Sequence, residues 1–305
     1  MTENSSQLNV NEASVNRKVR VGMVFLSLIP LSVFLMIQSV SQFPFLFLAM
    51  AEAYQSEAYK NAATVTESTR VIMDIFNSKY AIPAYLIYSI AGLIVFSIWY
   101  YKAFVKKGPR IKISQVFGVK SVIAMIGTAL CFDFVINAGM TLVSMLMPKI
   151  IEDYNLIVEM SGLVTNIWIT VIYVIFLAPL LEELVFRGVI YSYLEKSGIK
   201  PGLIILITGL AFGIVHFNLV QSTYACILGI FLGFLRYKYR SIKITVLTHA
   251  MINLMGTYGE EAVGKLGLNN GANLIIGGIA MVLLVFIVVL INSDKKAVGS
   301  SHNNP

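Results

Sequence analysis

Three charged side chains interrupt an apolar run in the middle of the chain. Glu182, Glu183 and Arg187 follow the apolar stretch 176–181. A charge at the centre of a membrane-spanning helix costs roughly 2.5–3.5 kcal/mol, so three of them require compensation. Glu183 and Arg187 are four residues apart with the acid first, which favours an ion pair within a helix. Glu182 lies about 100° further round the helix and stays available for chemistry. The open alternative is that all three anchor the helix at the membrane interface.

Two of the three histidines also lie in apolar segments, whereas His302 lies in a polar tail. Phe212 precedes His216 by four residues, and Asn253 follows His249 by four. At this spacing the members of each pair share one face of a helix. A single intramembrane histidine is usually a packing residue. Two of them, together with an unpaired glutamate, favour a functional site.

These residue types suit the hydrolysis of an amide by an activated water. Desolvation disfavours a charged carboxylate, which would let Glu182 act as a general base near neutral pH. His216 could orient the same water and carry a proton to the leaving amine. His249 and Asn253 could stabilise the oxyanion of a tetrahedral intermediate. The set therefore predicts hydrolysis without a covalent intermediate.

Other hydrolytic sites fit the sequence less well. It has no His-Glu-x-x-His zinc motif, no Gly-x-Ser-x-Gly turn and no intramembrane Gly-x-Gly-Asp motif. We therefore expect no cofactor, although two histidines with one or two carboxylates could bind zinc, and that alternative stays open. Cys131 and Cys226 both lie in apolar segments, so we interpret them as packing residues.

The elements that must position this site are membrane helices. Hydrophobic residues make up 57% of the 305 residues, charged residues only 13%, and mean hydropathy is +0.77. Soluble domains carry about 25% charged residues, so a soluble enzyme, a disordered protein and a nucleic-acid module are excluded. We predict an all-α polytopic bundle of about eight transmembrane helices around an intramembrane polar cavity. The expected spans are 21–49, 81–101, 119–147, 163–190, 201–217, 222–237, 243–258 and 272–292.

Loop charges give the expected orientation in the bilayer. If residue 20 is cytoplasmic, every loop on that side is basic, namely 102–112, 196–200, 236–243 and 295–296. The loops on the other side carry acids, as at 152–159 and in Glu260 and Glu261. The positive-inside rule then places both termini in the cytoplasm. The net charge of +7 comes from these loops and does not indicate a nucleic-acid partner.

The three motifs resemble, in order and spacing, those of the CAAX protease and bacteriocin-processing family. They read Glu182-Glu183-x-x-x-Arg187, Phe212-x-x-x-His216 and His249-x-x-x-Asn253, and the resemblance covers roughly residues 160–258. It implies an intramembrane endopeptidase in which Glu182 and His216 activate water and His249 and Asn253 form an oxyanion hole. Glu183, Arg187 and Phe212 would support the site. Substrates would be peptides or membrane-anchored proteins, and the location would be a bacterial cell membrane.

The expected organisation follows from the spans and the resemblance. It comprises a flexible cytoplasmic tail (1–20), N-terminal transmembrane helices with an outer loop near 51–80 (21–158), a CAAX protease-like core (159–258), a final transmembrane helix (259–292) and a cytoplasmic tail (293–305). Two other functions stay open: a non-catalytic scaffold or bacteriocin self-immunity protein, and a transporter with a proton relay.

Two positions remain open in this scheme. Asp133 is an acid inside an apolar span and could join the site or have a structural role. Glu182 lies 19 residues from Leu163, whereas His216 lies 15 residues into a span entered from the cytoplasmic side. The site can assemble only if the fourth helix continues to Lys196, with a kink at Pro179.

Overall fold

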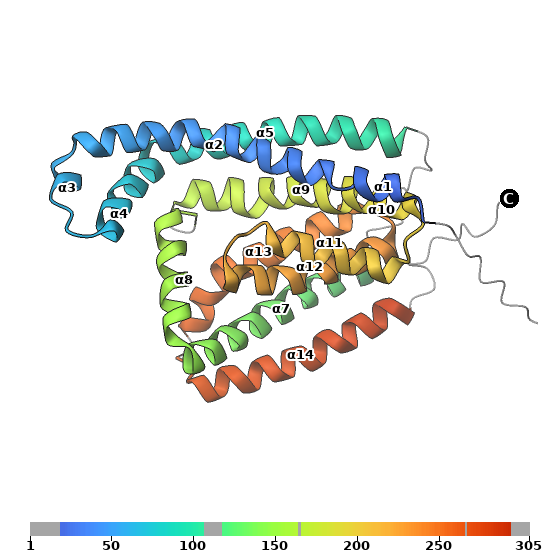
Figure 1. Ribbon diagram of the computed structural model, residues 1–305. Coiled ribbons are helices and arrows are strands. Elements are labelled where there is room, and N and C mark those ends of the chain that lie inside the picture. The colour runs from blue at the N-terminus through green and yellow to red at the C-terminus, as the bar shows by residue number, and fades with distance from the viewer. Residues whose placement is uncertain (1–18, 107–117, 164–165, 266, 294–305) are drawn as a thin grey trace, which may run out of the picture.

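The computed structural model describes residues 19–106, 118–163, 166–265 and 267–293, without the side chains of 119–121 and 260–264. Every regular element within these residues is a helix, as the hydropathy predicts (Figure 1). Most of the two expected tails, including His302, lies outside this description.

The N-terminal helices form one layer along the bundle. In Figure 1, α2 and α5 run side by side above the helix that contains α9 and α10. The segment expected as an outer loop, 51–80, is largely helical here. Its turn from α3 into α4 is fixed by Thr64, whose hydroxyl accepts a hydrogen bond from the backbone N–H of Glu67. The elements are α1 (Val21–Leu26), α2 (Ile29–Gln55), α3 (Glu57–Lys60), α4 (Val65–Ile75), the π-helical stretch η1 (Phe76–Tyr80), α5 (Ala81–Tyr100) and the π-helical stretch η2 (Tyr101–Val105).

The remaining helices build the body of the bundle. Figure 1 shows α8 running across one end, and α14 lying along α7 on the face opposite the N-terminal layer. The elements are α7 (Val119–Leu146), α8 (Pro148–Ser161), η3 (Ile169–Leu177, π-helical), α9 (Ala178–Glu183), η4 (Leu184–Ile190, π-helical), α10 (Tyr191–Ser197), α11 (Pro201–Ile214), α12 (Leu219–Tyr239), α13 (Ile242–Gly264) and α14 (Asn270–Ser293).

Six helical runs in the described residues are long and apolar enough to cross a membrane. They are Val21–Gln55, Val65–Val105, Val122–Leu146, Ile169–Ser197, Leu219–Tyr239 and Asn270–Ser293. The protein is therefore an all-α, multi-pass membrane bundle, but the structure supports six spans where the sequence predicted eight. The expected span 201–217 is the 14-residue helix α11, about 21 Å long, which is shorter than the hydrocarbon core of about 30 Å. The expected span 243–258 lies in α13, whose polar site residues lower its hydropathy.

Hydrogen bonds and an ion pair tie the helix ends together in two groups. At the basic end, the backbone N–H of Arg20 donates to the Ser197 carbonyl over 2.8 Å, and Lys238 Nζ donates to the Asn292 carbonyl over 2.9 Å. At the opposite end, Arg70 pairs with Glu159 at 2.7 Å. Positive charge is thus concentrated where the ends of α1, α10, α12 and α14 meet.

Small residues let α11 and α12 approach closely. A Cβ on Gly213 would lie 2.1 Å from Cys226 Sγ, and one on Gly229 would lie 2.9 Å from the Gly209 Cα. Substitution at these glycines would therefore separate the two helices. This contact fixes the position of α11, which carries Phe212 and leads into His216.

Candidate active site

The helix that carries the two glutamates continues through the bundle. Residues 169–197 form one helical run of 29 residues, with Glu182 at position 14. The expected continuation to Lys196 is therefore confirmed, and Glu182 lies mid-helix. The six-residue α9 that contains both glutamates is bounded by the π-helical stretches η3 and η4. Such stretches interrupt α-helices frequently at functional sites.

Glu183 and Arg187 form the ion pair that their spacing predicts. Arg187 Nη1 donates to Glu183 Oε1 over 2.8 Å, and both side chains are 0% exposed. Arg187 Nη2 donates to the Gly229 carbonyl over 2.8 Å, and the guanidinium lies 4.7 Å from the centre of the Phe212 ring. The pair thus joins the glutamate helix to α12 and α11.

Glu183 has a second partner that the sequence did not indicate. His249 Nδ1 lies 3.1 Å from Glu183 Oε1 in the buried interior. Since Glu183 is paired with a cation, its carboxylate oxygen accepts and Nδ1 donates. This hydrogen bond fixes the ring of His249, so that Nε2 points away from Glu183. The contact joins residues 66 positions apart, and helical spacing carries no signal for it.

Glu182 is the accessible carboxylate of the two. Its side chain is 17% exposed, and its Oε2 lies 3.8 Å from His249 Nε2. That distance is too long for a direct hydrogen bond but suits a bridging water. Glu182 also interacts electrostatically with His216. The structure therefore shows the expected difference between the two acids: Arg187 forms an ion pair with Glu183 and not with Glu182.

His216 joins the same group through Phe212. The two rings meet edge to face with centroids 5.2 Å apart, and Phe212 meets His249 in the same way at 5.5 Å. His216 Nδ1 lies 2.8 Å from the Phe212 carbonyl. Because a carbonyl can only accept, Nδ1 carries the hydrogen and the neutral ring presents Nε2 as an acceptor. Phe212 therefore separates and orients both imidazoles.

Asn253 is held by the helix that carries the glutamates. Its Nδ2 donates to the Val174 carbonyl over 2.8 Å. In a π-helical stretch that carbonyl would accept from residue 179, but Pro179 has no N–H. The Asn253 amide therefore replaces the missing donor. One amide hydrogen of Asn253 is thus committed to the backbone of the glutamate helix.

Asp133 lies away from these residues. It is buried on α7 and packs against Gly259, where an added Cβ would lie 2.8 Å from Asp133 Oδ2. Gly259 is ten residues after His249 on α13, about 15 Å along the helix axis. The contact favours the structural role of Asp133 over a place in the site.

The described residues do not fit a zinc site. No group of three or more His, Cys, Asp or Glu side chains in this part of the chain is placed to hold a metal ion. Both histidines use Nδ1 for a hydrogen bond, and Glu183 Oε1 is shared between Arg187 and His249. Glu182 and the Nε2 atoms of both histidines take no part in these hydrogen bonds.

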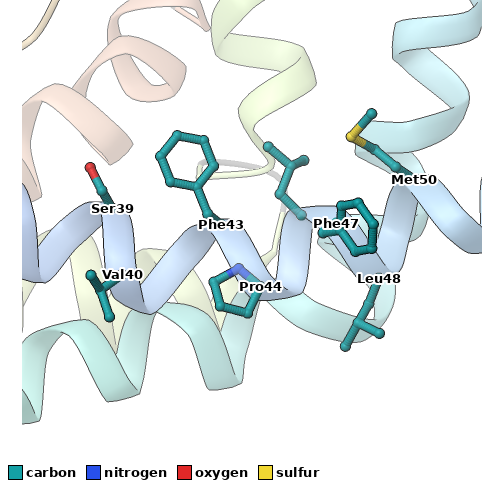
Figure 2. A pocket seen from close by; sticks show the side chains of 8 residues that line it. Ser39, Val40, Phe43, Pro44, Phe47, Leu48 and Met50 are labelled. Carbon is teal, nitrogen blue, oxygen red and sulfur yellow. The ribbon is translucent and has the colours of Figure 1, made fainter.

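The two best-defined cavities of the described residues do not coincide with the glutamates. One, of about 10 Å³, lies between α7, α12, α13 and α14. The other, of about 860 Å³, is an open apolar groove along α2, lined by Ser39, Val40, Phe43, Pro44, Leu46, Phe47, Leu48 and Met50 (Figure 2). All of its lining comes from one helix, whereas ligand sites enclose their ligand between several elements. The expected polar cavity is thus not shown.

The fold and the site together define a helical membrane protein with a buried glutamate–histidine centre. Residues 164–255 match the family model described as type II CAAX prenyl endopeptidase Rce1-like. The chain thus carries an Rce1-like domain of the CAAX protease and bacteriocin-processing family, which confirms the resemblance of the motifs. The comparison with curated proteins and that with solved structures each found no significant match.

Proposed function

We propose that this protein is an intramembrane endopeptidase that hydrolyses peptide bonds with a water activated by Glu182. The observation that carries the proposal is the arrangement of Glu182 and His249. An accessible carboxylate faces, at 3.8 Å, an imidazole whose other nitrogen is held by a fully buried ion pair. The Rce1-like domain over residues 164–255 supports the same reaction class.

The reaction would proceed in two steps. Glu182 takes a proton from the bound water as the water oxygen forms a bond to the carbonyl carbon of the substrate. The tetrahedral intermediate then collapses, the C–N bond breaks, and the leaving amine receives the proton. His216, which interacts electrostatically with Glu182, presents Nε2 to orient the water and to carry that proton.

His249 is suited to stabilise the charge that develops on the substrate. Glu183 Oε1 accepts from Nδ1 and holds the ring so that Nε2 lies on the side of Glu182. We assign His249 Nε2 and the second amide hydrogen of Asn253 to the oxyanion. Glu183, Arg187 and Phe212 hold these groups without contacting the substrate.

We further propose that the basic end of the bundle faces the cytoplasm. Arg20, Lys196, Lys238 and Arg240 gather there, as the positive-inside rule requires of a cytoplasmic surface. Substrates would be peptides or membrane-anchored proteins that reach the carboxylate from within the bilayer.

The test compares peptide termini in membranes and medium from cells that produce the wild-type protein or Glu182→Gln at matched levels. Glu159→Gln is the matched control, because Glu159 is an exposed carboxylate whose partner is Arg70, at the opposite end. We expect termini that appear with the wild type and with Glu159→Gln but not with Glu182→Gln. Identical termini in all three samples would overturn the peptidase and favour the scaffold.

A further inference from the structure

Two tyrosines that are in contact with each other both interact electrostatically with Glu182. Tyr88 lies on α5 and Tyr173 in the π-helical stretch η3, with ring centroids 6.3 Å apart in an edge-to-face contact. Tyr88 lies in the N-terminal layer, outside the matched domain 164–255. Motif spacing gives no indication of it.

Close helix packing brings Tyr88 to the site. A Cβ on Gly92 of α5 would lie 2.8 Å from a methyl carbon of Leu181, the residue before Glu182. Tyr88 is one helical turn from Gly92 and on the same face, so it lies alongside the glutamate helix. The Glu182 carboxylate interacts electrostatically with the hydroxyl groups of both Tyr88 and Tyr173.

Among the described residues, no side chain or backbone group accepts a hydrogen bond from either hydroxyl, and neither hydroxyl is one of the fully buried polar atoms that lack a partner. Both hydroxyls therefore reach accessible space, although Tyr88 as a whole is only 2% exposed. The rings are held firmly, since Tyr88 packs edge to face on Phe34 at 5.9 Å and Tyr173 stacks on Tyr85 at 4.4 Å. The protein therefore keeps two preorganised donors beside Glu182 without using them itself.

A hydrolytic site needs donors for the oxyanion, and one hydrogen of the Asn253 amide is committed to the Val174 carbonyl. We propose that the hydroxyls of Tyr88 and Tyr173 are further catalytic groups that donate hydrogen bonds to the scissile carbonyl oxygen as it becomes an oxyanion. Both tyrosines keep their protons throughout, so the bond changes of the hydrolysis are unaltered. This inference rests on the proposed function, and it makes α5 part of the catalytic site.

The test uses full-length protein in lipid vesicles and a synthetic peptide that spans a Glu182-dependent cleavage site found in the termini comparison. Tyr88→Phe and Tyr173→Phe each remove one hydroxyl and keep the ring. Tyr85→Phe is the matched control. Tyr85 stacks on Tyr173, but among the described residues its hydroxyl does not interact electrostatically with Glu182. We expect kcat to fall about 100-fold in Tyr88→Phe and in Tyr173→Phe, as for loss of one oxyanion donor.

KM and the thermal unfolding temperature separate a catalytic from a structural role. We expect both to stay near the wild-type values in the two variants, and all parameters of Tyr85→Phe to stay within about twofold. A kcat within twofold of the wild type in Tyr88→Phe and Tyr173→Phe would overturn the inference while leaving the peptidase intact. An equal loss in Tyr85→Phe would also overturn it, because packing and not the hydroxyl would then be responsible. If the wild type yields no Glu182-dependent termini, the proposed function fails first and this inference with it.

Discussion

Adjacent glutamates on one helix lie in two different environments. On the closed side, Glu183 is fully buried and bonded to Arg187 and His249. On the open side, Glu182 is 17% exposed and interacts electrostatically with His216, Tyr88 and Tyr173. A step of one residue, about 100° of helix rotation, thus separates a fully buried, paired acid from a partly exposed one.

The difference indicates how a membrane protein can keep a partly exposed carboxylate at mid-helix. A buried ion pair contributes little net stability, but removing one partner leaves a charge that the interior cannot solvate. The closed side therefore holds three helices in one arrangement, whereas the open side leaves hydrogen-bonding capacity free for a substrate. Four substitutions test this division, ordered from the largest expected effect on stability to the smallest.

Arg187→Met should have the largest effect, because it breaks the closed side. It leaves Glu183 buried and unpaired, which should lower the free energy of unfolding by about 3–5 kcal/mol. Thermal unfolding in detergent micelles measures the loss. Arg70→Met is the control, since its pair with Glu159 is exposed and screened by solvent, so its loss should change stability little. Equal losses in the two variants would contradict the closed side as a structural unit.

Gly213→Ala should disturb the support of His216. The added Cβ would lie 2.1 Å from Cys226 Sγ and 2.6 Å from the Ser222 carbonyl oxygen, so α11 and α12 must separate. Overpacking of this kind costs about 1–3 kcal/mol. Peptidase activity should fall further than the folded fraction does, because His216 moves with α11. Gly202→Ala, where an added Cβ meets no atom within 4 Å, should change neither quantity.

Asn253→Ala tests whether Asn253 supports the backbone of the glutamate helix, binds the oxyanion, or does both. It leaves the Val174 carbonyl without a donor, which should cost about 1–3 kcal/mol. Pro179→Ala supplies a backbone N–H, so the double variant should regain part of that stability in the same unfolding assay. Activity should stay low in the double variant if Asn253 also binds the oxyanion. Full recovery of activity would assign Asn253 to the backbone alone.

Glu182→Gln should have the smallest effect on stability and should abolish activity. Its nearest charged contact is the 3.8 Å approach to His249, so unfolding should change by less than about 1 kcal/mol. Glu183→Gln should be much less stable, because Arg187 loses its charged partner. A destabilised Glu182→Gln protein would show that the open side is structural as well.

Contacts between residues four positions apart were predictable because their geometry is local. The Glu183–Arg187 pair and the Phe212–His216 contact both follow from that spacing, although α11 ends at Ile214 and His216 lies in the turn after it. The continuation of the glutamate helix to Lys196 was also predicted, as the condition for Glu182 and His216 to meet. The sequence predicted eight spans, whereas the described residues contain six helical runs that are long and apolar enough to span. The difference arises because α11 is too short and α13 is too polar.

The sequence by itself determined the class of the protein and the residues that could react. The low content of charged residues required a membrane bundle. The acids and histidines that lie inside its apolar segments identified the candidate site. Only the tertiary structure decided which helices meet there. It joined Glu183 to His249 across 66 residues and Asn253 to the Val174 carbonyl across 79, and it brought Tyr88 of the N-terminal layer beside Glu182. The physical reason is that helical periodicity fixes directions within a helix, whereas close packing at residues such as Gly92 and Gly229 fixes which faces come together.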